Sequence, residues 1–183
     1  MKRYSIFLIA CMAICLTACT SWKSARSAAE CRPVIFPDYA EVTIPSNIAP
    51  LNFMVEDAGR IQASFRHEGN ELLKVRGREG VVQIPLKKWR EMLKLAAGGN
   101  IDVYVSVWSD EYPQGMAYLP FPIHVEDREI DPWVAYRLIE PGYVSWRQLG
   151  LYQRDLTSFK ESAIVTNHET ISTCLNCHHF PSY

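Results

Sequence analysis

A short motif of cysteine and histidine near the end of the chain has the most definite chemistry in the sequence. Cys174-Leu175-Asn176-Cys177-His178 follows the pattern C-x-x-C-H, which is the attachment pattern of a c-type haem. Two thiols at this spacing can add to the two vinyl groups of one porphyrin, and the histidine that follows becomes an axial ligand of the iron. The sequence therefore predicts that Cys174 and Cys177 bind haem c covalently and that His178 is the proximal iron ligand.

Three other uses of the motif stay open. Zinc binds both cysteine and histidine, and His179 adds a further ligand, although adjacent histidines rarely bind one ion together. A thioredoxin-like redox pair normally begins a helix within a βαβ unit, and this sequence has no such pattern. A structural disulfide is the third alternative. Haem attachment is the favoured interpretation because the start of the chain indicates export.

A sixth iron ligand has to come from upstream, because only five residues follow His178. His168 is the nearest histidine and is the first candidate. A methionine at an apolar position usually belongs to the core, and a single histidine usually lies at the surface. For that reason the remaining candidates are weaker: His67, His124, Met54, Met92 and Met116. Without any of them the iron would be five-coordinate or bound to water.

The first residues of the chain predict an export signal and a lipid anchor. Two basic residues precede a short apolar run at 6–16, which is too short to span a bilayer comfortably. Leu16-Thr17-Ala18-Cys19 follows and is similar to a bacterial lipobox. We therefore expect residues 1–18 to be a lipoprotein signal peptide and Cys19 to be lipidated. Thr20, rather than an aspartate, comes next, which favours an outer-membrane anchor with the protein facing the periplasm.

Charge and motif content exclude some classes of function. Removal of residues 1–18 takes two basic residues and no acidic ones, so the net charge changes from −1 to −3. This balance argues against a nucleic-acid partner, which favours a basic patch. The sequence contains no nucleophile elbow, phosphate loop or H-E-x-x-H motif, so we expect no enzyme activity. The expected partners are the membrane, through the lipid anchor, and a redox or envelope protein.

One cysteine of the mature chain has no assigned use. Cys31 remains once Cys19 is lipidated and the other two belong to the haem motif. An odd cysteine in an exported protein is either a free thiol or an intermolecular partner. We expect Cys31 to be a buried free thiol, with a transient bond to the motif as the alternative.

The middle of the chain predicts a mainly β fold. After a small, polar tether at 19–30, we expect a β-sandwich-like domain at 31–165, with one or two short helices, and an extended C-terminal tail at 166–183. Alternating apolar residues place both faces of 101–108 in the core, and Pro120 and Pro122 indicate an edge strand. The predicted strands are 41–44, 51–56, 61–67, 72–76, 81–84, 101–108 and 116–125.

Two segments have helical signals. Apolar residues recur at helical spacing over 86–97, and Gly98-Gly99-Asn100 is typical of a helix end. Asp131-Pro132 is typical of a helix start, with an N-cap followed by proline, and so predicts a short helix over 133–139. The aromatic and charged segment 145–159 predicts one or two further helical turns.

Several stretches of the chain resemble one family of bacterial envelope lipoproteins. These are Phe36-Pro37-Asp38-Tyr39, residues 42–53, residues 136–143, Tyr152-Gln153-Arg154 and the C-x-x-C-H motif. The family is often described as TolB-like or as "cytochrome c biosynthesis" proteins. In it, a β-propeller usually follows the motif, and the motif histidine is more often followed by Ser-Phe than by His-Phe. The resemblance implies that this chain corresponds to the N-terminal module without the propeller.

Together these patterns predict a lipid-anchored envelope protein with one covalent c-type haem, used for electron transfer or as a structural group. The alternative is a non-catalytic binding or scaffold lipoprotein, in which the motif serves a disulfide or a metal. A third hypothesis, a thiol–disulfide oxidoreductase, requires a shifted pKa at Cys174. Haem staining separates the first hypothesis from the other two.

Overall fold

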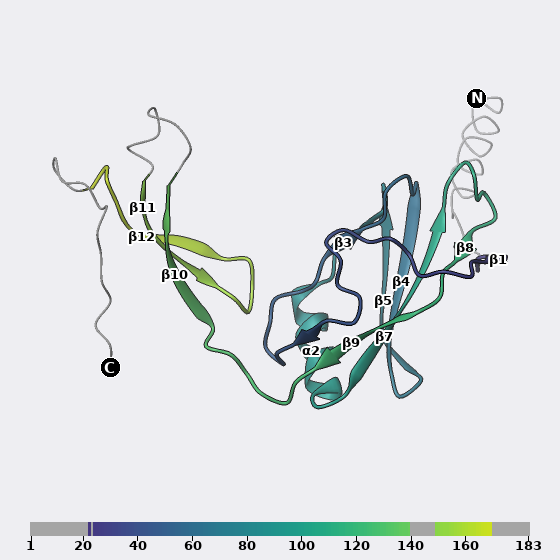
Figure 1. The fold of residues 1–183 in the computed structure, drawn as a ribbon, viewed down its shortest axis with the longest axis horizontal. Helices are drawn as coiled ribbons and strands as arrows, with labels where there is room; N and C mark the ends of the chain where they lie inside the picture. The colour runs from purple at the N-terminus through teal and green to yellow at the C-terminus, as the bar shows by residue number, and fades with distance from the viewer. Residues whose placement is uncertain (1–21, 23, 140–148, 170–183) are drawn as a thin grey trace, which may run out of the picture.

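The computed structural model describes residues 22, 24–139 and 149–169, and within them the predicted mainly β fold is confirmed (Figure 1). The strands form several sheets that do not close into a barrel. The elements in chain order are β1 (Ser27–Ala28), β2 (Thr43–Ile44), β3 (Phe53–Met54), β4 (Arg60–His67), β5 (Asn70–Arg78), β6 (Val81–Val82), α2 (Leu86–Ala96), β7 (Asn100–Trp108), β8 (Met116–Ala117), β9 (Phe121–Val125), β10 (Trp133–Leu138), β11 (Gly150–Asp155) and β12 (Glu161–Thr166).

The largest sheet is built around β7. On one side β7 pairs antiparallel with β4, which in turn pairs with β5. On its other side β7 pairs antiparallel with β8 near its end and with β9 near its start. Two short strands extend these neighbours in parallel, β1 along β8 and β2 along β9. The predicted strand 116–125 is therefore two strands, which separate at the proline-containing segment 118–120.

The hairpin of β4 and β5 follows from its turn residues and its alternation. Glu68 and Gly69 both have positive φ, 49° and 81°, as a two-residue type I′ turn requires. Ile61, Ala63 and Phe65 alternate toward the buried face and are at most 1% exposed. This period of two places the intervening residues of β4 on the opposite face of the sheet.

A single hydrophobic core fills the space between the main sheet, α2 and the β3–β6 pair. Trp89 of α2 is fully buried, and its Nε1–H donates a hydrogen bond to the carbonyl of Ile48 at 2.9 Å. Its ring meets Phe65 edge to face, with centroids 6.4 Å apart. The helix and the two-stranded pair thus form the layer that covers one face of the main sheet.

The predicted helix 86–97 is confirmed as α2. Trp89, Met92, Leu93 and Ala96 form its buried stripe. Gly98 follows with a φ of 75°, and its N–H donates to the carbonyl of Val125. The Gly-Gly pair therefore ends the helix and returns the chain to the main sheet, as its sequence indicated.

Two of the other secondary-structure predictions are wrong. Trp133–Leu138, predicted as a helix, is strand β10, and 150–155, within the segment predicted to hold helical turns, is strand β11. The side chain of Asp131 accepts a hydrogen bond from the N–H of Trp133 at 3.0 Å, but this contact closes a turn before a strand. Pairing of β10 with β11, and of β11 with β12, supplies the backbone partners that override the local helix signal.

The face of β7 opposite the core is only partly buried. Ile101, Val103 and Val105 are buried as predicted, and Trp108 is 5% exposed. Tyr104 is 36% exposed, so the prediction that both faces of this strand lie in the core is wrong at this position. Within residues 24–139 and 149–169, no layer of helix or strand covers Tyr104, because α2 and the β3–β6 pair lie on the other face.

The three-stranded sheet β10–β11–β12 is joined to the main body by a fixed connection. The side chain of Asn47 exchanges two hydrogen bonds with the backbone of Ile130 in the connecting segment, at 2.8 and 3.0 Å. The guanidinium of Arg90 donates to the carbonyl and to the hydroxyl of Thr157, both at 3.0 Å. The turn between β11 and β12 therefore contacts α2 directly. Within the residues placed by the structure, no helix is long and apolar enough to cross a bilayer.

Candidate functional site

The residues of the predicted haem and lipid sites lie outside the described part of the chain. Cys174, Cys177 and His178 belong to 170–183, and Cys19 belongs to 1–21. Haem attachment and lipidation therefore stay predictions. The structure does describe the segments that lead toward both sites.

The turn that precedes the predicted haem motif, at residues 166–169, is held by hydrogen bonds. Asn167 is buried, and its N–H donates to the carbonyl of Leu149 at 2.9 Å. The N–H and hydroxyl of Thr166 both donate to Glu169 Oε2, at 2.8 and 3.1 Å. Cys174 follows Glu169 by five residues, so it lies within about 18 Å of this turn even in a fully extended chain. The motif is consequently confined to the neighbourhood of the three-stranded sheet.

The proposed sixth ligands lie in different environments. His168 is exposed on the turn after β12. His67 Nδ1 lies 2.8 Å from the carbonyl oxygen of Asn100, and His124 Nδ1 lies 2.8 Å from the side-chain oxygen of the same residue. Both of these histidines are therefore engaged at the end of the main sheet where β7 begins.

The candidate methionines are buried or half-buried. Met92 is 1% exposed within α2, so its expected structural role is confirmed. Met54 and Met116 are half-buried, and Met116 packs against the core. Among the described residues, no three His, Cys, Asp or Glu side chains cluster closely enough to hold a metal ion. Of the six sixth-ligand candidates, His168 alone is exposed on the turn next to the motif.

Cys31 is exposed, so the prediction that it is a buried free thiol is wrong. The chain passes Cys31 at the edge of the main sheet, where its carbonyl accepts a hydrogen bond from the N–H of Leu119 at 3.0 Å. The backbone is thus held while the side chain points to solvent. Burial and the neighbouring Cys31 raise the pKa of Tyr118.

The segment predicted as a tether contacts the body of the protein. β1 pairs with β8, and the N–H groups of Ser27 and Ala29 donate to the carbonyls of Gly115 and Ala117. Gly115 has a φ of 87°, and a Cβ added there would lie 2.5 Å from the indole nitrogen of Trp108. Only glycine fits between this strand and that indole, which is a physical reason for its presence.

A cluster of arginine and tryptophan side chains lies where the N-terminal segment meets the main sheet. The guanidinium of Arg60 lies 5.6 Å from the ring centroids of both Trp22 and Trp108. The guanidinium of Arg76 lies 5.3 Å from the Trp22 ring, and the two indoles pack edge to face at 5.5 Å. These distances fit cation–π contacts. We call Trp22, Arg60, Arg76 and Trp108 the Arg–Trp cluster.

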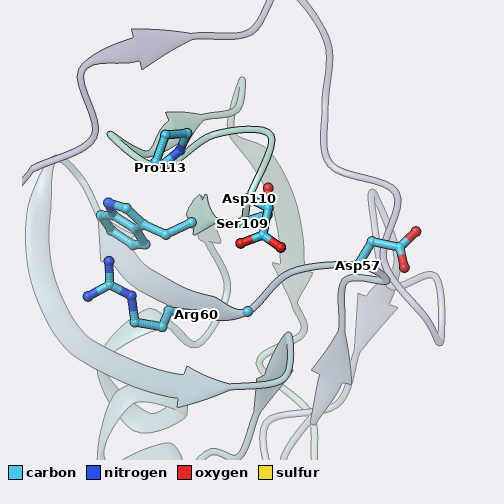
Figure 2. Close-up of a pocket in the computed structure, with 7 residues that line it drawn as sticks. Asp57, Arg60, Ser109, Asp110 and Pro113 are labelled. Atoms are coloured by element: carbon cyan, nitrogen blue, oxygen red, sulfur yellow. The ribbon is translucent and has the colours of Figure 1, made fainter.

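A pocket of about 460 Å³ adjoins this cluster. Figure 2 shows Arg60 on one side of the pocket, Asp57 on the far side and Asp110 between them. Trp108 supplies an apolar wall and Ser109 a hydroxyl. A pocket with both charges and an indole wall has the chemistry to hold a small polar ligand by hydrogen bonds and ring stacking.

The sequence analysis did not identify the Arg–Trp cluster. Trp22 lies in the segment predicted as a tether, and no role was predicted for Arg60 or Arg76. The sequence does contain a signal that these arginines lie on one face of the sheet. Arg60 alternates with the buried Ile61, and Arg76 and Arg78 are two positions apart on β5, so they share a face. The contact with Trp22 had no local signal because it joins residues far apart in the sequence.

Comparison with known proteins adds no family assignment. No family model, curated protein or solved structure matches this chain. The resemblance to TolB-like envelope lipoproteins therefore stays a prediction from the residues that carry it.

Proposed function

We propose that this chain is a lipid-anchored envelope protein that carries one covalent c-type haem on the segment after β12. The observation that carries the proposal is the motif Cys174-Leu175-Asn176-Cys177-His178 in a chain that begins with an export signal and the lipobox-like Leu16-Thr17-Ala18-Cys19. The haem would serve one-electron transfer or a structural role, and the protein would be anchored in the outer membrane and face the periplasm.

The surroundings of the tail support haem attachment. The turn at Thr166 and Glu169 holds the chain five residues before Cys174, next to the three-stranded sheet. At the end of the sheet where this turn lies, two large hydrophobic side chains are exposed: Ile139 at 52% and Ile164 at 47%. A porphyrin needs apolar cover, and side chains of this kind within reach of the motif can provide it.

Haem attachment requires little from the residues outside the motif. Cys174 and Cys177 would hold the haem through two thioether bonds, each thiol adding its sulfur and hydrogen across one vinyl group with no external oxidant. His178 would bind the iron through a ring nitrogen. His168, exposed on the turn before the motif, is the candidate for a further iron ligand. When bound, the haem supplies reversible one-electron oxidation and reduction.

The second candidate function is a binding or scaffold lipoprotein without haem. The pocket beside Arg60 and Trp108 favours it, because it combines both charges with an aromatic wall in a chain with no catalytic motif. In this case Cys174 and Cys177 would form a disulfide or bind a metal.

Intact mass and a reduced pyridine haemochrome spectrum distinguish these functions. The full chain is expressed in a host that matures c-type haem. We expect a mass gain of one haem and a spectrum of two thioether bonds. Cys174→Ser should give the spectrum of a single thioether, and the matched control Cys31→Ser, which removes an exposed cysteine outside the motif, should leave the two-bond spectrum unchanged.

An unmodified mass, with the motif cysteines free or joined to each other, would refute the haem proposal and favour the binding protein. The same mass spectrum tests lipidation at Cys19, because acyl chains add mass independently of the haem. Fractionation of the envelope then tests the outer-membrane prediction.

A further inference from the structure

Among the described residues, no helix or strand covers one face of the main sheet, and this face carries most of the basic residues of its strands. β4 alternates buried Ile61, Ala63 and Phe65 with outward residues. The register of the hairpin places outward residues of β5 beside them, with Arg60 opposite Arg78 and Ser64 opposite Lys74. β7 continues the rows on the other side, where Trp108 pairs with Arg60 and Tyr104 with Ser64. α2 lies on the opposite face, against the core.

The charge of this face differs from that of the whole chain. It carries five basic side chains and two acidic ones, although the chain has a net charge of −1. The acidic Glu71 is already engaged, because Ser64 donates to it at 2.6 Å and Lys74 lies 3.0 Å away. We call this surface the basic face: Arg60, Arg66, Lys74, Arg76 and Arg78, with Glu71 and Asp102.

Aromatic side chains lie among the basic ones. The guanidinium of Arg66 lies 4.5 Å from the ring centroid of Tyr104, and that of Arg60 lies 5.6 Å from the ring centroids of both Trp22 and Trp108. The acidic Asp57 and Asp110 line the adjoining pocket rather than the rows themselves. Arginine with tryptophan and tyrosine is the composition that binds the headgroup region of a bilayer, where guanidinium groups meet phosphates and indole rings lie at the interface.

The N-terminal segment brings this face close to the predicted lipid anchor. Trp22 rests on Arg60 and Arg76 and follows Cys19 by three residues. An extended chain spans at most about 3.6 Å per residue, so Cys19 lies within about 11 Å of Trp22. A bilayer that holds acyl chains on Cys19 therefore lies next to the basic face and not next to α2.

We propose that the basic face binds the surface of a bilayer that contains anionic phospholipids. This inference rests on the proposed lipid anchor for its orientation and extends it, because the anchor supplies attachment and the basic face supplies recognition of lipid charge. Each Arg or Lys near an anionic surface strengthens binding roughly fivefold, and a salt-screened field is effective only within about 10 Å.

The test uses the mature chain from residue 19 with Cys19→Ser, so that no acyl chain contributes to binding. This chain retains every described residue. It is sedimented with vesicles of phosphatidylglycerol and phosphatidylcholine, and in parallel with vesicles of phosphatidylcholine alone. We expect binding to the anionic vesicles only, and we expect it to be lost at about 1 M salt, where the screening length falls to about 3 Å.

Variants that lose positive charge on one side of the main sheet or on the other test which side binds the vesicles. Replacement of Lys74, Arg76 and Arg78 by glutamine should weaken binding to anionic vesicles roughly a hundredfold. The matched control replaces Lys87, Lys88 and Lys94 of α2 by glutamine, which removes the same charge from the opposite side and should change binding less than about threefold. Circular dichroism and thermal melting check that both triple variants fold. If the variant of Lys74, Arg76 and Arg78 does not fold, Arg78→Gln alone replaces it in the binding test, with an expected weakening of about fivefold.

Equal binding to both kinds of vesicle, or no binding to either, would overturn the proposal. Equal loss in the α2 variant would overturn it as well, since the attraction would then depend on overall charge. Binding of the unlipidated chain to an acidic protein, with no binding to anionic vesicles, would show that the face serves a protein partner instead. The lipid anchor and the haem are read from the mass of the native protein, so their failure is distinguishable from failure of this inference.

Discussion

The hydrogen bonds of Arg90 hold the three-stranded sheet to the body of the protein. Arg90 lies on the exposed side of α2 and donates to both the carbonyl and the hydroxyl of Thr157 in the turn between β11 and β12, at 3.0 Å each. Arg90→Met keeps most of the aliphatic length of the side chain and removes both donors. The perturbation therefore acts on the junction and leaves the core of α2, with Trp89 and Leu93, unchanged.

The expected loss of stability at this junction follows from the charge of the donor and from the exposure of the two hydrogen bonds. Hydrogen bonds from a charged donor contribute roughly 1.5–3 kcal/mol in mutational series, but solvent screening reduces exposed ones, so we expect a loss of about 1–2 kcal/mol. That loss corresponds to a factor of about 5 to 30 in the local opening equilibrium. Other contacts remain, since the N–H of Ala49 donates to the carbonyl of Leu156 at 2.8 Å. The junction should loosen without unfolding.

Native-state amide hydrogen exchange measures this effect. Amides of β11 and β12 should exchange about 5 to 30 times faster in Arg90→Met, while amides of β4 and β7 keep their rates. Lys94→Met, one helical turn along the same exposed side of α2, is the matched control and should leave both sheets unchanged. Unchanged exchange in the three-stranded sheet, or equal acceleration in β4 and β7, would refute the view that Arg90 holds a separately opening unit.

Two further predictions concern the β4–β5 hairpin. The hydrogen bond from the hydroxyl of Ser64 is the main cause of the lowered pKa of Glu71, so this carboxylate stabilises the fold above its unfolded pKa, and the contribution is lost as pH falls through the lowered value. Glu71→Gln should flatten that part of a plot of the urea midpoint against pH. An unchanged slope would contradict the assignment. Gly77→Ala should destabilise the protein by about 3 kcal/mol in thermal melts, because its Cβ would lie 1.8 Å from the carbonyl oxygen of Val81. Gly69→Ala, with open space around the new Cβ and a φ of 81°, should destabilise it by only about 1 kcal/mol. Equal losses would show that the close approach at Gly77 is not the cause.

Local patterns were sufficient to predict the core of the main sheet. The alternation around Ile61, Phe65 and Val103 predicted buried strands, and all three side chains are at most 1% exposed. The helical spacing around Trp89 and Leu93 predicted α2 for the same reason. In each case the period of the apolar residues and the nature of the flanking turns indicate the same element, so local and tertiary preferences agree.

The failures arose where partners distant in sequence decide the outcome. Asp131 and Pro132 give the local signal of a helix start, but Trp133 and Val134 are strand formers that pair with Asp155 and Arg154 of β11. Cys31 has an apolar side chain, yet it lies at a sheet edge where only its backbone is held. Neither the pairing partner nor the edge position is visible in the neighbouring residues.

The chemistry of the predicted haem site was carried by spacing alone. Cys174, Cys177 and His178 predict haem attachment through their order, and that prediction needs no knowledge of the fold. The basic face is the opposite case, because Arg60, Arg76 and Trp22 become neighbours only through the β4–β5 register and the return of the N-terminal segment. Sequence patterns could identify reactive residues, but not surfaces assembled from distant segments.

The pairing of β1 with β8 sets an order of assembly for the chain. Ser27 pairs with Met116, whereas the β4–β5 hairpin closes between neighbouring residues. Local contacts form before distant ones, so the N-terminal strand is secured only after most of the main sheet exists. Until then the residues before β1 have no docking site. Under the proposed lipid anchor, lipidation of Cys19 would precede the pairing of β1 with β8, and that pairing would then shorten the free chain between the bilayer and the main sheet.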